Sequence, residues 1–410
     1  MILFSHPTGN ANVRNALHAF AEANLLKEFW TCVAWSDGWK LNRLLPRSLR
    51  AQLCRRSFES RVLEVTHSRP WREVGRLLSS AMHAQRLTRH EAGAFCVDAV
   101  YRDLDHAVAR RLNRLRDISA VYAYEDGALE TFREAGRAGV TRVYDLPIGY
   151  WRAGLAIQNE EAELQPEWAP TLIATLDSAE KFERKDEELR LADHVIVASR
   201  FTQETLRQAG SINGRIDVIP YGAPEPDAQF TRRCNRRLRV MFAGSLSQRK
   251  GISYFFKALE PFGHHVDTTV VGRAPAMCNP LEQALQRCTW HPSLPQPQLW
   301  EQMRQHDVLI LPSLFEGFGL VLLEAMARGM IVITTPNTAG PEIIDHGVNG
   351  FVVPVRSPHA ITAVLEELLR DRRRLQMIGD AALRKARQYT WAKYQAQLVA
   401  AVQSAAKAAA

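Results

Sequence analysis

The sequence predicts an α/β protein made of two doubly wound domains that face each other across a cleft. Short apolar runs typical of buried strands alternate with amphipathic helical stretches in both halves of the chain. The two halves repeat this pattern at similar size, and 410 residues suit two domains. A segment rich in proline and glycine, residues 218–230, separates the halves and is the expected linker.

In the first half, residues 1–5 (MILFS) read as the opening strand, and residues 7–26 as a turn that leads into a helix. A helical stretch at residues 129–139 lies among further short apolar runs, each of the length typical of a buried strand. We expect these strands at residues 120–125, 141–147 and 194–199.

The second half repeats the alternation. Strands are expected at residues 237–244, 267–272, 307–313 and 330–335, and helices at residues 254–262, 299–306 and 320–329. The expected domains are residues 1–215 and 216–388, followed by an alanine-rich helix in residues 389–410 that packs back toward the first domain. In open parallel sheets, ligands bind at the carboxyl ends of the strands, so we expect the binding and catalytic residues in the loops that follow them.

The composition excludes several classes of protein. No apolar run approaches the ~18 residues that a membrane span needs, and the opening apolar run is too short for a signal peptide. The six cysteines are scattered with no CxxC pair, which argues against a structural zinc site. The chain also lacks HExxH, GxGxxG and P-loop motifs. We therefore expect a cytoplasmic protein with no metal site.

The net charge of +8 is unevenly distributed. Residues 40–116 hold 17 Lys and Arg against 7 Asp and Glu. Such a block can attract nucleic acid, anionic lipid or an acidic substrate, or it can be a solvated helical surface. Nucleic acid is the weakest option because no nucleic-acid-binding signature accompanies the block. Leucines interleave with arginines at residues 41–58, which favours lipid headgroups.

The loop after the first strand of the second half, FAGSLSQRKG, has phosphate-binding features. Gly244 permits a close turn, and Arg249 and Lys250 bring two cations to a helix start, where backbone N–H groups point outward. A diphosphate would meet both charge and donors there. The alternative is a surface turn with incidental cations.

A second loop, FEGFGLVLLEAMA, carries two carboxylates eight positions apart, Glu316 and Glu324. Gly317 and Gly319 admit close backbone approach between them. Glu324 stands among apolar residues of the expected helix, so it needs hydrogen-bond partners if it is buried. Vicinal hydroxyls of a ribose or a sugar are suitable partners. The alternative is an exposed Glu324 on the polar side of the helix.

These motifs resemble those of family 4 retaining glycosyltransferases, which have the GT-B fold of two Rossmann-like domains. The resemblance rests on Glu316-x7-Glu324, on Gly244-x-Leu-x-x-x-Lys250-Gly, and on the run from DVLILPS to GFVVP. It is strong over residues 190–390. It covers the first 190 residues only through the architecture and the opening loop SHPTGNANVRNA.

The resemblance implies a role for each motif residue. Glu316 would contact hydroxyls of the donor sugar, and Glu324 those of the ribose. Lys250, with Arg249, would neutralise the diphosphate, and Gly9 would approach the donor from the opposite domain. The backbone amides of Phe318 to Leu320, in the turn from Gly317 through Gly319, would hold the sugar and phosphate. The implied reaction transfers a sugar from a nucleoside-diphosphate sugar with retention, without metal or cofactor.

The sequence departs from the family pattern at two points. Ser245 stands where many relatives carry an arginine, and Arg249 is the expected substitute. Where many relatives carry a histidine after an N-terminal strand, this chain reads AYEDG, so Glu125 or Asp126 is the expected residue that orients or deprotonates the acceptor. His6 is a second candidate, and the alternative for each is a structural role.

The implied acceptor is a glycan or a lipid-linked carrier, in the synthesis of bacterial surface polysaccharide or glycolipid. The basic block adds the hypothesis of peripheral attachment to the anionic inner membrane surface. Two other functions stay open at this point. A sugar-nucleotide epimerase on the same fold needs no acceptor, and a non-catalytic protein could retain sugar-nucleotide binding without turnover.

Overall fold

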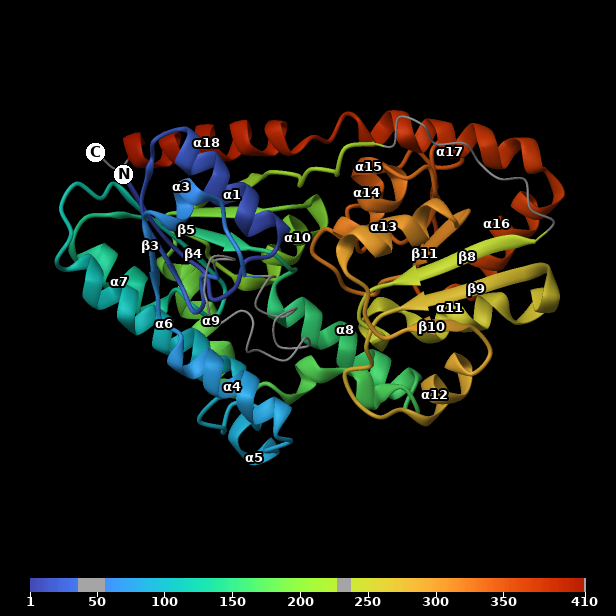
Figure 1. Cartoon of the computed structure of the whole chain (residues 1–410), viewed down its shortest axis with the longest axis horizontal. Coiled ribbons are helices and arrows are strands. Elements are labelled where there is room, and N and C mark those ends of the chain that lie inside the picture. Colours follow the sequence, from blue (N-terminus) through green and yellow to red (C-terminus); the bar gives the residue numbers. More distant parts are fainter. Residues whose placement is uncertain (36–55, 227–236, 409–410) are drawn as a thin grey trace.

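The computed structural model describes residues 1–35, 56–226 and 237–408. It contains two all-parallel sheets, each covered by helices, in two domains that lie next to each other (Figure 1). The N-terminal sheet has seven strands in the order β3-β2-β1-β4-β5-β6-β7, and the C-terminal sheet has six in the order β10-β9-β8-β11-β12-β13. Both orders reverse beside the first strand, as expected of doubly wound folds.

The N-terminal sheet is buried on both faces. All five residues of β4 are buried, and alternate side chains enter separate cores, Tyr122 on one face and Val121 on the other. The strands are β1 (Ile2–Ser5), β2 (Leu26–Thr31), β3 (Thr66–Ser68), β4 (Ala120–Tyr124), β5 (Thr141–Leu146), β6 (His194–Val197) and β7 (Arg215–Val218).

Helices with side-chain caps connect these strands. Asn10 accepts a hydrogen bond from the backbone N–H of Val13 at the start of α1, and Ser178 does the same for Lys181 at the start of α9. The helices are α1 (Ala11–Glu22), α3 (Ser60–Leu63), α4 (Trp71–Ala81), α5 (Gln85–Thr88), α6 (Val97–Leu112), α7 (Leu129–Arg137), α8 (Trp151–Leu164), α9 (Ala179–Leu191) and α10 (Arg200–Thr205), with 3-10 turns η2 (Ala169–Thr171), η3 (Ile173–Leu176) and η4 (Leu206–Ala209).

The C-terminal domain follows the same plan. Its strands are β8 (Leu238–Ala243), β9 (Val266–Val271), β10 (Thr289–His291), β11 (Val308–Leu311), β12 (Ile331–Thr334) and β13 (Phe351–Val352). Its helices are α11 (Ile252–Leu259), α12 (Asn279–Leu285), α13 (Gln296–Arg304), α14 (Leu320–Met326), α15 (Gly340–Ile343), α16 (Pro358–Arg370) and α17 (Arg372–Ala386), with 3-10 turns η5 (Gln248–Lys250) and η6 (Glu260–His265).

The last helix, α18 (Trp391–Ala408), returns to the N-terminal domain. In Figure 1 it runs along the top of that domain above α1. Its inner side chains are buried in the core that also contains β1 and β4, and Gln395 donates a hydrogen bond to Asn15 of α1 at 2.9 Å. The chain thus crosses between the domains twice.

Every strand and helix expected from the sequence is present within a few residues of its expected position. The N-terminal sheet extends past residue 215, the expected end of the first domain, because β7 pairs with β6 through Val218. Residues 227–230 of the expected linker and residues 36–55 of the basic block lie outside the described residues. Within the part of the chain described, no helix is long and apolar enough to cross a membrane.

Candidate active site

The loop between β8 and α11 brings Lys250 over the carboxyl end of the C-terminal sheet. Gly244 has a φ of 150°, and a Cβ there would lie 3.2 Å from the Lys250 side chain, which passes over it. Gly251 is left-handed (φ 71°) and lies so close to Pro312 that a Cβ would approach that carbonyl oxygen to 2.1 Å. These two glycines let the loop fold tightly and direct the lysine inward.

Lys250 and Arg249 both reach Glu316. The Lys250 ammonium forms an ion pair and hydrogen bond with Glu316 Oε2, and Arg249 Nη1 lies 3.6 Å from the same oxygen. The Glu316 side chain is only 13% exposed. Burial by itself raises the pKa of Glu316, but the charges of Lys250 and Arg249 outweigh it and lower the pKa to about 2. Glu316 is therefore an ionised carboxylate beside two cations.

The turn after Glu316 is held by both domains. Gly317 lies against the N-terminal domain so closely that a Cβ would come within 1.9 Å of the Pro147 carbonyl oxygen. Its own carbonyl accepts hydrogen bonds from the hydroxyls of Ser199 and Thr202. Gly319 adopts a left-handed conformation (φ 80°) directly before α14. The sequence-predicted turn thus lies at the interface of the two domains, with Phe318 buried and Leu320 half-buried.

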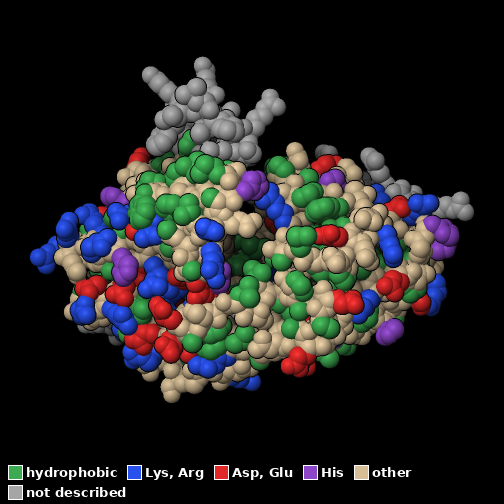
Figure 2. Space-filling model, turned by 90° about the horizontal axis from the view of Figure 1, so that it is seen from below, with side chains coloured by type: hydrophobic (Ala, Val, Ile, Leu, Met, Phe, Trp, Pro, Cys, Tyr) green, Lys and Arg blue, Asp and Glu red, His purple; other side chains and the backbone are tan. Residues whose placement is uncertain are grey.

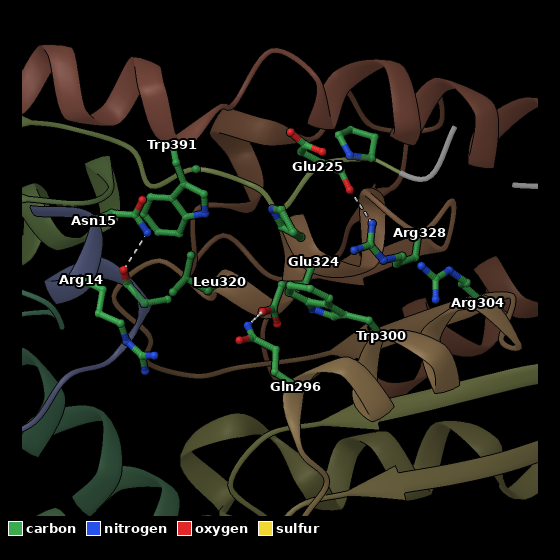
Figure 3. A pocket seen from close by; sticks show the side chains of 14 residues that line it. Arg14, Asn15, Glu225, Gln296, Trp300, Arg304, Leu320, Glu324, Arg328 and Trp391 are labelled. Carbon is green, nitrogen blue, oxygen red and sulfur yellow. Dashed lines mark hydrogen bonds between the residues drawn. The ribbon is translucent and has the colours of Figure 1, made fainter. Parts of the chain in front are cut away.

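Glu324 lines a cavity of about 810 Å³ between the domains. Figure 3 shows it beside Gln296 and Trp300 of the C-terminal domain, with Arg14 of α1 on the opposite wall. Gln296 Nε2 donates to Glu324 Oε1 at 2.8 Å. Burial raises the pKa of Glu324, and the Gln296 hydrogen bond opposes that rise. The carboxylate faces a space large enough for a nucleoside.

Most side chains of this cavity were not singled out from the sequence, among them Arg14, Trp300 and Arg328. Arg14 donates a hydrogen bond to the Gly9 carbonyl at 2.6 Å. Arg328 stacks on Trp300, with its Cζ 4.9 Å from the ring centroid, and donates a hydrogen bond to the Glu225 carbonyl at 2.6 Å. Arg328 follows Glu324 by one helical turn, which is the only sequence signal that could have pointed to it.

Within the N-terminal domain, the opening loop packs Gly9 against Phe58. A Cβ on Gly9 would lie 2.6 Å from the Phe58 ring, so packing explains the glycine there. His6 is buried, and its Nδ1 accepts a hydrogen bond from the Thr8 backbone N–H at 3.0 Å. Burial lowers the pKa of His6 to about 4, so this imidazole is neutral at pH 7.

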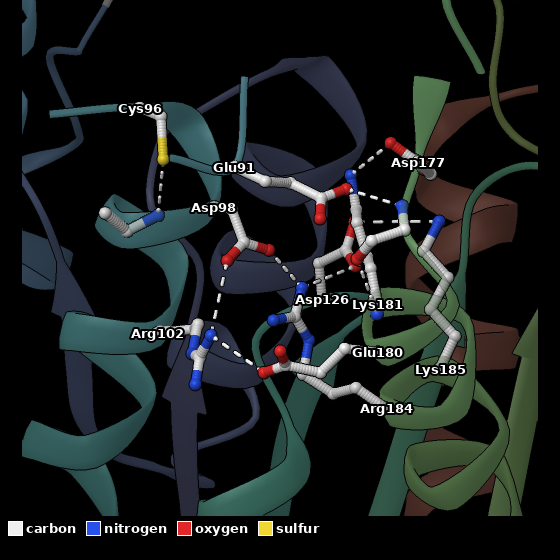
Figure 4. Close-up of polar contacts among 12 residues, drawn as sticks. Glu91, Cys96, Asp98, Arg102, Asp126, Asp177, Glu180, Lys181, Arg184 and Lys185 are labelled. Atoms are coloured by element: carbon white, nitrogen blue, oxygen red, sulfur yellow. Dashed lines mark hydrogen bonds and ion pairs between the residues drawn. The ribbon is translucent and has the colours of Figure 1, made fainter. Parts of the chain in front are cut away.

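Glu125 and Asp126 lie at the end of β4 and form ion pairs with α9. Lys185 Nζ is 3.4 Å from Glu125 and 3.7 Å from Asp126, and Arg184 donates to Asp126 at 3.2 Å. Arg184 also pairs with Asp98 of α6, and Figure 4 shows this network of acids and bases. Burial raises the pKa of Glu125, against the opposing charge of Lys185.

One cluster within the described residues has the spacing of metal ligands: His90, Glu91 and Asp177, whose ligand atoms lie within 4.8 Å of one another. The Lys181 ammonium already lies 2.9 Å from Asp177 Oδ1. A bound divalent cation would therefore face a neighbouring positive charge.

Comparison with known families identifies the C-terminal domain. Residues 237–371 match the family described as Glycosyl transferases group 1. A D-inositol 3-phosphate glycosyltransferase of Xylanimonas cellulosilytica is 28% identical over 232 residues, which are 50% of this chain and 56% of that relative. The chain thus aligns with little more than half of that relative's length.

Solved structures extend the likeness to the whole fold. Sucrose-phosphate synthase of Thermosynechococcus elongatus superposes with a TM-score of 0.68 at 16% identity, over 98% of each chain. HepE (Alr3699) of Anabaena, solved with UDP-glucose, has a TM-score of 0.61 at 18% identity, over 98% of this chain and 99% of that one. The comparisons confirm the predicted GT-B fold and the predicted resemblance to glycosyltransferases. The roles of individual site residues stay predictions.

Proposed function

We propose that this chain, whose residues 237–371 form a glycosyl transferases group 1 domain, moves a sugar from a nucleoside-diphosphate sugar to an acceptor hydroxyl. In this reaction the bond between the anomeric carbon and the diphosphate breaks, and the diphosphate leaves with the bonding electron pair. A bond to the acceptor oxygen forms as the acceptor proton passes to a base, for which Glu125 or Asp126 is the predicted residue. The fold and motif resemblance support retention at the anomeric carbon, as in family 4 enzymes.

The observation that carries the proposal is the set of Glu316, Lys250 and Arg249 at the carboxyl end of the C-terminal sheet. One carboxylate with two cations leaves a net positive charge, which suits a departing diphosphate. Glu316 is ionised and is assigned to the hydroxyls of the donor sugar, from which a carboxylate accepts hydrogen bonds. Glu324, at the 810 Å³ cavity, is assigned to the ribose. HepE binds UDP-glucose on the same fold, which supports a nucleotide-sugar donor.

Calorimetric titration with UDP, GDP, ADP and NAD, without added metal, tests this donor site. We expect tight binding of one nucleoside diphosphate and a loss of about tenfold or more in Glu324→Ala, since a pair of hydrogen bonds to a charged group is removed. Binding of NAD alone, or of none of the four, would contradict the proposal. A sugar-nucleotide epimerase is not favoured by the comparisons, and release of an epimerised donor without acceptor would be its signature.

We further propose that the acceptor is a glycan or lipid-linked carrier met at an anionic membrane surface. Helix α4 carries an exposed apolar stripe, with Trp71 48%, Leu78 47% and Met82 68% exposed. Spacings of seven and four residues align these side chains on one helix face. Arg86 of the neighbouring α5 and Arg89, which directly follows that helix, are also exposed. Figure 2 views the molecule from the side of α5 and shows hydrophobic side chains on the N-terminal half of that face.

Co-sedimentation with vesicles of phosphatidylglycerol and phosphatidylethanolamine tests this attachment. Met82→Asp should weaken binding, because it places a charge in the apolar stripe. Met377→Asp is the matched control, since Met377 is equally exposed (69%) on α17 of the other domain. Binding that needs no anionic lipid, or that Met377→Asp weakens as much as Met82→Asp, would contradict the attachment.

A further inference from the structure

A segment of the N-terminal half packs against the C-terminal domain. We call residues 151–171, comprising α8 and η2, the strap. In Figure 1, α8 lies between the two domains and its far end approaches α11. The turn η2 contacts η5, the part of the phosphate loop that contains Arg249 and Lys250. The strap therefore belongs to one half by sequence and reaches the donor site of the other.

Glu161 of α8 is fully buried, and the partners of its carboxylate come from the C-terminal domain. Its Oε1 accepts hydrogen bonds from Gln248 Nε2 and from the Tyr254 hydroxyl, both at 2.7 Å, and its Oε2 accepts one from Arg356 Nε at 2.7 Å. The exposed fraction of Glu161 is 0%. A buried carboxylate with three good donors is stable in one orientation, and losing any donor leaves it undersatisfied.

Gln248 is the residue before Arg249, and both polar atoms of its side chain form hydrogen bonds. Its side-chain amide donates to Glu161 and to the Ser253 hydroxyl at 2.6 Å, and its amide oxygen accepts from the Ser253 backbone N–H at 3.1 Å. Its own backbone N–H donates to Thr171 Oγ1 at 2.9 Å. Two of these contacts, from Glu161 and Thr171, come from the strap.

The first turn of the strap also packs against the loop that carries Glu316. Phe315, which precedes Glu316, packs against the start of α8. A Cβ on Gly149 would lie 2.6 Å, and one on Gly154 2.8 Å, from its ring. Residues 149–171 thus contact both the residue before Arg249 and the residue before Glu316.

We propose that Glu161 and Thr171 are positioning residues for the donor diphosphate, an inference that rests on the function proposed above. They hold Gln248, and through it the direction in which Arg249 and Lys250 project. Neither residue touches the donor. Preorganised cations bind a diphosphate more tightly than cations that must first be ordered, because that ordering costs entropy at the moment of binding.

Comparing variants of two neighbouring glutamates distinguishes this positioning role from a general packing role. Glu160 and Glu161 both accept hydrogen bonds from Arg356, but Glu160 is 58% exposed and only Glu161 reaches Gln248. In Glu161→Gln, the new amide presents N–H groups to neighbours that are themselves donors. We expect about tenfold weaker binding of the nucleoside diphosphate that the wild type prefers. Glu160→Gln should bind it as the wild type does.

Hydrogen–deuterium exchange of the protein without nucleotide tests the positioning directly. Peptides covering residues 244–252 should exchange faster in Glu161→Gln and in Thr171→Val than in the wild type. Thr171→Ser, which retains the hydroxyl, and Glu160→Gln should exchange at the wild-type rate. This measurement is independent of the proposed chemistry.

The two experiments have separable outcomes. If the wild type binds no nucleotide but the loop exchanges faster in Glu161→Gln, the proposed donor is wrong and the positioning of the loop stands. If the wild type binds a nucleotide and Glu161→Gln matches it in both affinity and exchange, the positioning role is overturned and the donor site stands. Equal acceleration in Glu160→Gln would also overturn the inference, since it would trace the effect to Arg356.

Discussion

The carboxyl ends of the two sheets carry acids in different electrostatic settings. In the C-terminal domain, one carboxylate, Glu316, lies beside two cations, Lys250 and Arg249. In the N-terminal domain, Glu125, Asp126 and Asp98 pair with Arg184 and Lys185 of α9. Asp98 also lies 3.8 Å from Arg102 of α6 (Figure 4). The first group has one acid beside two cations, whereas the second has three acids beside three cations.

This difference assigns different partners to the two edges. The C-terminal group attracts a diphosphate through its excess of positive charge, and the N-terminal group has no such excess. The same contrast appears in the acids themselves. Burial acts on both Glu316 and Glu125, but two cations lower the pKa of Glu316 to about 2, while the pKa of Glu125 is raised.

Replacing the lysine on each side gives the largest expected contrast. Lys250→Ala should reduce turnover about 100-fold or more, because it removes a charge next to the leaving group. It should also weaken nucleoside-diphosphate binding. Lys185→Ala should leave that binding unchanged and lower the free energy of unfolding by about 3 kcal/mol, since it leaves the largely buried Glu125 carboxylate without its paired cation. Kinetics, calorimetry and chemical denaturation measure the three effects; weaker nucleotide binding in Lys185→Ala would erase the contrast.

Neutralising the acids sharpens the comparison. Glu316→Gln should lower turnover by about 10²-fold while changing affinity for the free nucleoside diphosphate far less, because its contact is with the sugar. Steady-state kinetics beside calorimetry separates the two effects. Glu125→Gln tests the predicted role of Glu125 at the acceptor: it should raise the KM for the acceptor and leave nucleotide binding unchanged. Full turnover in Glu316→Gln would show that the site assignment is wrong.

Acid titration gives the smallest expected effect. The folded-state pKa of Glu316 is lowered from 4.5 to about 2, so its ionisation stabilises the fold above pH 4.5, and this contribution is lost as the pH falls toward 2. By pH 3.5 the loss is about 1.4 kcal/mol. Glu316→Gln should therefore lose less stability than the wild type between pH 6 and pH 3.5, measured by urea denaturation.

The opposite sign is expected for Glu125. Its folded pKa is raised, so its contribution is unfavourable as the pH rises through the unfolded value of 4.5 and toward the folded value. Glu125→Gln should consequently be more stable relative to the wild type at pH 6 than at pH 3.5. A change in the same direction for both variants would contradict the electrostatic contrast.

The sequence by itself determined the strand and helix alternation, the fold and the donor-half motifs. Long apolar runs such as those of β8, β11 and β12 are buried on both faces and need no tertiary knowledge to identify. The strands that escaped prediction are β2, β7 and three short ones. The short ones are β3, β10 and β13, which have two or three residues and partly exposed side chains. Such short edge strands depend on a neighbour for their hydrogen bonds and leave little periodicity to read.

Only the tertiary structure decided which charges meet. Glu125 and Lys185 are 60 positions apart, and Glu161 and Gln248 are 87 positions apart in opposite halves of the chain. Their pairing arises from how α9 covers its sheet and how the strap crosses to the other domain. The loop spacing placed Lys250 near Glu316, because parallel strands end at one edge. Nothing local in the sequence shows that Glu161 reaches Gln248, since that contact depends on how the two domains pack together.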